Sequence, residues 1–209
     1  MFFLYPVENM IFGKKSYPKS GANSLHTKFN KKFLMIAVIP LIIAHRGNSS
    51  EAPENTMSAF RSACEIPVQY IECDVHLSKD AVPVIFHDRT IERTTNFNKA
   101  RRIGAMNFEE IKKLDAGSWF SPQFSGEQIP SLKELLQMNR DDLGLMIELK
   151  PTLFRKKALA QAVAKVLQEE DSLKNIFIGS FDFTVLKELR KLSPHIALMG
   201  IAETAKEIK

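Results

Sequence analysis

The stretch YIECDVHLSKDAVPVIFHD, residues 70–88, decides the local architecture of the chain. It contains two short apolar runs, Tyr70–Val75 and Val82–His87, which are typical of buried strands. Only about half a dozen residues separate the runs, whereas parallel neighbouring strands need a crossover of about a dozen residues or more. The two runs therefore predict an antiparallel hairpin that turns near Asp80.

This hairpin is expected to gather polar side chains at one end of the sheet. Side chains alternate faces along a strand, so Glu72 and Asp74 point the same way and Cys73 points to the opposite face. The predicted turn puts these two acids level with His87 and Asp88. Two acids and a histidine should therefore meet there.

The rest of the chain alternates short apolar runs with helical patterns after residue 38, the order of βα units around a parallel sheet. The fold class is therefore α/β. Further strands are predicted at Ile39–Ala44, Leu145–Leu149, Ile176–Ser180 and Ile196–Gly200. Helices are predicted at Asn55–Glu65, Phe108–Leu114, Ser131–Met138, Lys156–Glu170 and Phe183–Leu192.

The formal charge of +5 on the 209 residues comes from residues 1–40. That segment holds six lysines against the single acid Glu8, so the remainder is neutral overall. A neutral domain without zinc-finger spacing is a poor nucleic-acid binder, and we exclude that class of partner. We expect a basic leader at residues 1–37, which is either disordered or precedes the true start of translation. We expect one domain at residues 38–209.

The apolar run Phe33–Ala44 follows two lysines and resembles the beginning of a signal peptide. It is too short to span a bilayer stably, and its second half is better explained as the first buried strand. We therefore expect a cytoplasmic protein. Cys64 and Cys73 predict neither a disulfide framework nor a zinc site, and the oligomeric state stays open.

Acidic side chains recur at the ends of predicted strands. Glu148 and Lys150 repeat the i, i+2 spacing of Glu72 and Asp74. Carboxylates that converge in this way repel one another unless a cation joins them. Ligation by oxygen alone favours Mg²⁺ or Ca²⁺ over Zn²⁺, so we predict one divalent cation of either kind.

Basic side chains and histidines lie at the same strand ends. Arg46 and Lys150 can neutralise a phosphate, and His45 and His87 have the ordinary pKa that suits proton transfer near neutrality. Any one of these residues, or of the acids, is explained equally well or better by a structural role. Their coincidence at the predicted strand ends favours a functional site.

Three neighbouring polar residues have simpler explanations than a functional one. Asp88 is interpreted as a turn or cap residue, and Asn55 and Thr56 as helix caps.

Several motifs resemble those of the glycerophosphodiester phosphodiesterase family. The first block comprises His45-Arg46-Gly47, Ala52-Pro53-Glu54-Asn55-Thr56 and Ala59-Phe60. The second comprises Ile71–Asp80, Val82–Asp88 and Arg93-Thr94-Thr95. Later landmarks are Ile129–Leu132, Ile147–Lys150 and Ser180–Asp182. The resemblance covers about residues 41–200.

The resemblance implies a TIM-type (β/α) barrel and a metal-dependent phosphoric diester hydrolase of lipid metabolism. It assigns Glu72, Asp74 and Glu148 to the metal, His45 and His87 to acid–base catalysis, and Arg46 and Lys150 to the phosphate. The implied reaction cleaves a small glycerophosphodiester to glycerol 3-phosphate and an alcohol. The glycerol hydroxyl next to the phosphate attacks phosphorus, one histidine removes its proton, the other protonates the leaving alkoxide, and water then opens the cyclic phosphate. Which histidine acts first is left open.

Two features depart from the family pattern. Ala81 stands where the family commonly has glycine, which strains the turn if that position needs a positive φ. Only 169 residues follow position 40, whereas eight-stranded barrels usually need about 250. We therefore expect about six of eight strands and a C-terminal truncation. The alternatives are a catalytically silent fragment, or a relative acting as a lysophospholipase D or sphingomyelinase D.

Overall fold

The computed structural model describes residues 2–5, 41–138, 143–170 and 175–202. In these residues five strands lie parallel, in the order β2, β3, β5, β6 and β7. Their bounds are Leu41–Ala44, Tyr70–Leu77, Gly144–Leu149, Ile176–Ser180 and Ala197–Gly200. Each strand lies where the apolar runs predict one.

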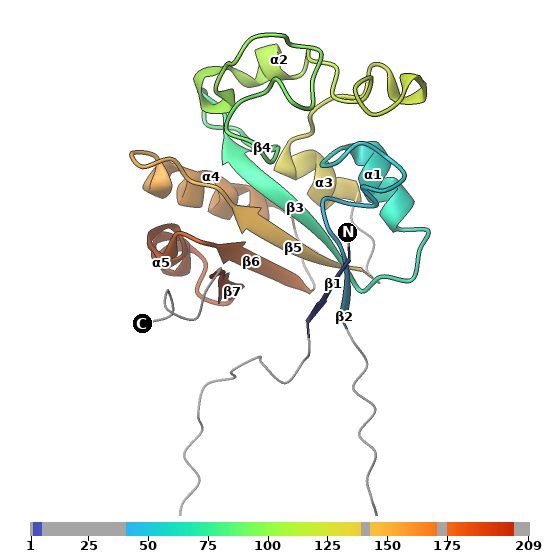
Figure 1. Ribbon diagram of the computed structural model, residues 1–209. Coiled ribbons are helices and arrows are strands. Elements are labelled where there is room, and N and C mark those ends of the chain that lie inside the picture. Colours follow the sequence, from blue (N-terminus) through green and yellow to red (C-terminus); the bar gives the residue numbers. More distant parts are fainter. Residues whose placement is uncertain (1, 6–40, 139–142, 171–174, 203–209) are drawn as a thin grey trace, which may run out of the picture.

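Helices connect the strands as predicted. They are α1 (Met57–Ala63), α2 (Phe108–Ile111), α3 (Leu132–Met138), α4 (Lys156–Glu169) and α5 (Phe183–Leu192). Helix α4 packs between α3 and α5 along the sheet, and α2 lies with its loops above the carboxyl ends of the strands (Figure 1). No helix in the described ranges is long and apolar enough to cross a membrane.

The predicted hairpin is confirmed. Strand β4 (Pro83–Ile85) pairs antiparallel with β3 alone and lies off the path of the sheet, with Val75 opposite Ile85. Ala81 in the turn adopts φ = 66°, the left-handed region that disfavours a side chain. The turn therefore carries the strain expected of an alanine at a glycine position.

Strand β1 (Phe2–Tyr5) was not predicted from the sequence. It pairs antiparallel with β2, so this part of the basic leader belongs to the sheet. The rest of the leader and its boundary at residue 37 lie outside the described residues.

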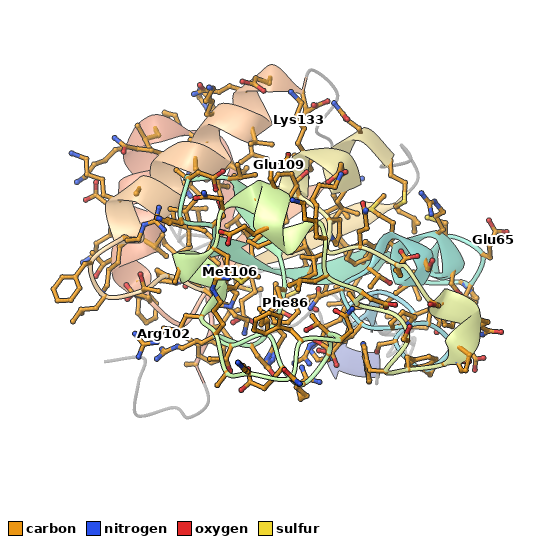
Figure 2. All side chains as sticks on the ribbon, turned by 90° about the horizontal axis from the view of Figure 1, so that it is seen from above. Glu65, Phe86, Arg102, Met106, Glu109 and Lys133 are labelled. Atoms are coloured by element: carbon orange, nitrogen blue, oxygen red, sulfur yellow. The ribbon has the colours of Figure 1, made fainter. Side chains whose placement is uncertain are left out.

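Two apolar cores hold the fold. The larger one lies between the sheet and helices α1, α3, α4 and α5, and Cys73, Leu145 and Ile147 are fully buried in it. The smaller one joins Phe86 and Met106 to helix α2, over the middle of the molecule in the view from above (Figure 2). It supports the loops on the face where the strands end, and that face carries the polar residues singled out in the sequence.

Candidate active site

Three carboxylates converge at the ends of β3 and β5. Strand pairing sets Asp74 beside Glu148, and Glu72 lies on the same face of β3 as Asp74. One oxygen of each of the three side chains lies within 4.8 Å of the others. The convergence predicted from the spacing is therefore present.

The cluster is electrostatically unfavourable by itself. Glu72 and Asp74 are almost completely buried, and burial together with the charge of Asp74 raises the pKa of Glu72 well above its usual value. Oδ1 of Asp74 is buried, and its partner in the described part of the chain is the ammonium of Lys150, 3.1 Å away. Three converging carboxylates, two of them almost completely buried, fit a hard divalent cation such as Mg²⁺ or Ca²⁺.

Two basic side chains border the cluster. Nζ of Lys150 lies 3.1 Å from Oδ1 of Asp74 and 2.8 Å from Oε1 of Glu148. Burial lowers the pKa of Lys150, but the two carboxylates outweigh it and raise the pKa, so the ammonium stays charged. Nε of Arg46 lies 3.3 Å from Asp74, and its backbone N–H donates to Glu72 at 2.9 Å.

A tight turn after β2 positions the first histidine. Arg46 and Gly47 adopt φ values of 59° and 80°, and a Cβ on Gly47 would lie only 2.7 Å from the backbone of Ala59. The turn brings Nε2 of His45 to 3.8 Å from Oε2 of Glu72. Burial, with a contribution from the Arg46 charge, lowers the pKa of His45 to about 4.

The second histidine is held by its neighbour in the chain. Nδ1 of His87 lies 2.6 Å from Oδ1 of Asp88, and Asp88 also accepts a hydrogen bond from Nε of Arg93 at 2.6 Å. Burial raises the pKa of Asp88, but these two hydrogen bonds outweigh it and lower the pKa to about 2. The prediction of a turn or cap role for Asp88 is therefore incomplete, because its carboxylate orients the His87 ring.

Arg93 connects the two histidine-bearing segments. It donates to both oxygens of Glu54, at 2.9 and 2.7 Å, and Glu54 also accepts from Nη1 of Arg46 at 2.9 Å. The chain of contacts therefore runs from Arg46 through Glu54, Arg93 and Asp88 to His87. Sequence reasoning quoted Glu54 and Arg93 within family motifs but gave them no role, because only the fold brings them together.

Asn55 was also misassigned. Thr56 is the N-cap of α1, as predicted, and accepts a hydrogen bond from the backbone N–H of Ala59. Asn55 adopts φ = 58° instead, and its Nδ2 donates to Oδ2 of Asp74 at 2.8 Å. It therefore orients a carboxylate of the cluster rather than capping the helix.

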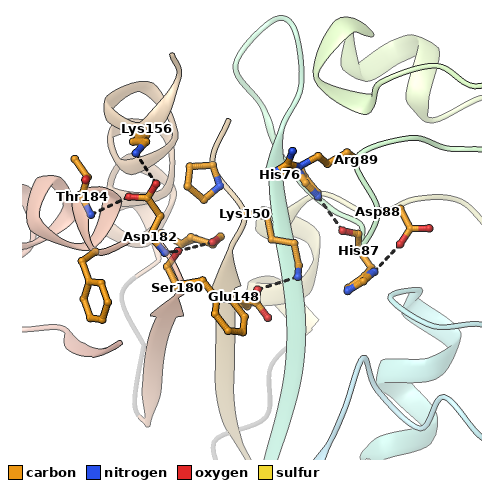
Figure 3. Close-up of a pocket in the computed structure, with 14 residues that line it drawn as sticks. His76, His87, Asp88, Arg89, Glu148, Lys150, Lys156, Ser180, Asp182 and Thr184 are labelled. Atoms are coloured by element: carbon orange, nitrogen blue, oxygen red, sulfur yellow. Dashed lines mark hydrogen bonds and ion pairs between the residues drawn. The ribbon is translucent and has the colours of Figure 1, made fainter. Parts of the chain in front are cut away.

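A cavity of about 790 Å³ opens beside the cluster. His87, Glu148 and Lys150 line it, as does His76, whose Nε2 lies 3.0 Å from the backbone oxygen of His87 (Figure 3). Across the cavity, Lys156 pairs with Asp182 at 2.6 Å. A small anionic molecule in this cavity would meet a histidine and basic groups.

Comparison with known proteins agrees with this arrangement. A model described as the glycerophosphoryl diester phosphodiesterase family matches residues 45–208. The chain belongs to this family. It is 38% identical over 159 residues to the glycerophosphodiester phosphodiesterase of Caldanaerobacter subterraneus subsp. tengcongensis, covering 76% of the chain. The chain spans 65% of that relative's length.

Solved structures of the family share the fold. A phosphodiesterase of Oleispira antarctica, in complex with the product sn-glycerol-3-phosphate, matches with a TM-score of 0.72 and 35% identity, covering 79% of this chain and 69% of that one. The glycerophosphodiester phosphodiesterase of Agrobacterium tumefaciens matches with a TM-score of 0.66 and 35% identity, covering 75% and 64%. The predicted α/β fold of the TIM-barrel type is therefore confirmed.

Proposed function

We propose that this chain carries the active site of a metal-dependent hydrolase that cleaves glycerophosphodiesters to glycerol 3-phosphate and an alcohol. The observation that carries the proposal is the convergence of Glu72, Asp74 and Glu148 beside a cavity lined by His87 and Lys150. Membership of the family supports it, as does the product bound in the Oleispira relative.

The three carboxylates, with Asn55 orienting Asp74, are the residues that would hold one Mg²⁺ or Ca²⁺. When bound, the cation supplies positive charge that offsets the phosphoryl oxygens and lowers the pKa of the attacking hydroxyl. It would also offset the burial and the carboxylate repulsion that together raise the pKa of Glu72.

The basic residues bind and orient the phosphate in this proposal. Lys150 lines the cavity, whereas Arg46 is not part of the lining and pairs with Asp74 and Glu54. Lys150 is therefore the direct contact for a phosphoryl oxygen, and Arg46 adds positive charge from the turn after β2.

Two histidines move the protons. The 2.6 Å contact between Nδ1 of His87 and Asp88 leaves Nε2 of His87 as the nitrogen that exchanges a proton with the substrate. His45 is the second member of the pair. One of them takes the proton of the glycerol hydroxyl as its oxygen attacks phosphorus, and the other gives a proton to the alkoxide that leaves, which forms the alcohol and a cyclic phosphate. Water then opens the cyclic phosphate to give glycerol 3-phosphate.

Release of choline from glycerophosphocholine, measured with and without EDTA, tests the proposal. We expect turnover that EDTA abolishes and that Mg²⁺ or Ca²⁺ restores. Turnover unaffected by EDTA would contradict the metal role. Absence of turnover with either cation would favour a catalytically silent chain.

A lipid-type substrate is a second candidate. Phe181 and Phe183 line the cavity and are 47% and 45% exposed. Exposed aromatic side chains at a phosphate-binding cavity favour a substrate with an apolar part, such as a lysophospholipid. Comparing glycerophosphocholine with lysophosphatidylcholine as substrates separates the two candidates.

A further inference from the structure

Two apolar side chains project into solvent from the loop between β5 and α4. Phe154 is 93% exposed and Leu153 is 72% exposed, more than any other large apolar residue in the described part of the chain. Single exposed apolar residues are common, but an adjacent pair presented almost completely to water is a feature of contact surfaces.

The loop that presents this pair is anchored on both sides. The backbone N–H of Arg155 donates to Thr152 at 3.1 Å, which closes the tip, and Nη1 of Arg155 donates to the backbone oxygen of Ser78 at 2.7 Å. Lys156 pairs with Asp182 at 2.6 Å. The apolar tip is therefore held outward by defined contacts.

The tip lies at the mouth of the cavity. Pro151 and Lys156, the residues on either side of the loop, both line the cavity, whereas the residues between them do not. The chain thus leaves the cavity wall, exposes Leu153 and Phe154 and returns to the wall. Whatever binds the tip would lie against the entrance to the candidate active site.

The charges around the tip are mainly positive. The apolar pair is followed directly by three bases, Arg155, Lys156 and Lys157. A fourth base, Lys79, is adjacent, because Nη2 of Arg155 donates to the backbone oxygen of Lys79 at 3.3 Å. Each of these bases interacts with an acid: Arg155 with Asp80, Lys156 with Asp182, Lys79 with Glu110 and Lys157 with Glu188. Glu110 also pairs with Arg101 and Glu188 with Lys191, so six bases lie among four acids in this part of the described chain and the excess charge is positive.

We propose that Leu153 and Phe154 insert into an anionic phospholipid surface, with the basic residues of the same loop at the level of the headgroups. Apolar side chains flanked by lysine and arginine match the two layers of such a surface, an apolar interior below anionic headgroups. The cavity mouth then faces the lipid. The apolar tip formed by Leu153 and Phe154 is distinct from the residues that perform the chemistry.

Cosedimentation of the full chain with vesicles tests the inference, and the probe is a mixture of phosphatidylglycerol and phosphatidylcholine. We expect binding that weakens as salt is added, because salt screens the headgroup attraction. The double variant Leu153→Ser/Phe154→Ser should bind about tenfold or more weakly. Lys157→Glu should also weaken binding.

Two matched controls separate a specific contact from general effects. Leu192→Ser removes an exposed apolar residue on α5, and Lys165→Glu reverses a charge further along α4. Both should leave binding unchanged, and thermal melts should show that all variants fold. Because binding is measured without substrate, the result does not depend on hydrolase activity.

Three outcomes would overturn the inference. The first is wild-type binding as weak as that of the double variant, and the second is equally tight binding to pure phosphatidylcholine vesicles. The third is self-association of the chain without vesicles that the double variant abolishes, which would identify a second copy as the occupant of the tip. Sedimentation velocity without lipid detects it.

Discussion

Replacing Arg93 with methionine is expected to slow catalysis more than it destabilises the fold. Arg93 donates four hydrogen bonds at 2.6–3.1 Å, two to Glu54 and two to Asp88. Asp88 in turn holds Nδ1 of His87 at 2.6 Å. Methionine keeps an apolar stem but removes every donor, so both carboxylates lose their common partner.

The expected loss of stability is modest. The Arg93 side chain is 44% exposed, so water competes for its contacts, and exposed ion pairs contribute about 0.2–1 kcal/mol each. Two such pairs give about 0.4–2 kcal/mol, which lowers Tm by about 1–8 °C in a protein of this size.

The expected loss of activity is larger. Without Arg93, Asp88 loses the guanidinium that holds its carboxylate beside His87, and a displacement of about 1 Å in a reacting group can cost about 100-fold in rate. We expect kcat to fall about 10- to 100-fold with a smaller change in KM, because His87 acts mainly in the transition state.

Arg101→Met is the matched control for this experiment. Arg101 is 40% exposed and pairs with one carboxylate, that of Glu110, at 3.1 Å, outside the chain of contacts that leads to the histidines. Its replacement should alter Tm slightly and leave kcat unchanged. In a double-mutant cycle, Arg93→Met should add little to Asp88→Asn, because both act through the same histidine. Equal kcat values for Arg93→Met and Arg101→Met would refute the positioning role.

Three other changes give independent tests. In EDTA-treated protein, Glu72→Gln should reduce the loss of stability that occurs as the pH rises above about 4.5, because burial and the charge of Asp74 raise the folded pKa of Glu72 and penalise its ionised form; an unchanged pH dependence in urea unfolding would contradict this. Ala81→Gly should raise the free energy of unfolding by about 0.5–1 kcal/mol by relieving the positive φ, a gain that an unchanged urea midpoint would exclude. Gly47→Ala should lower that free energy by about 2 kcal/mol or more, since its Cβ would clash with the backbone of Ala59, and a melting curve like that of wild type would show the turn to be adaptable.

The sequence by itself determined the strands and helices after residue 40 and the acidic cluster. Apolar periodicity placed the strands and helices, because it reflects which face of each element is buried. The short connection after Leu77 required an antiparallel hairpin, and the expected turn near Asp80 agrees with the observed register, in which Val75 lies opposite Ile85. The i, i+2 spacing of Glu72 and Asp74 put both on one face of β3, since side chains alternate along any strand.

Only the tertiary structure decided how the site is supported. Glu54, Arg93 and Asp88 are separated by up to 39 residues, and nothing in their local sequence shows that one guanidinium joins two carboxylates. Asn55 looks like a cap in sequence, yet its positive φ turns its amide toward Asp74. Local patterns follow from the geometry of a single strand or helix, whereas these contacts depend on how the turns after β2 and β4 fold over the sheet, which a one-dimensional pattern does not contain.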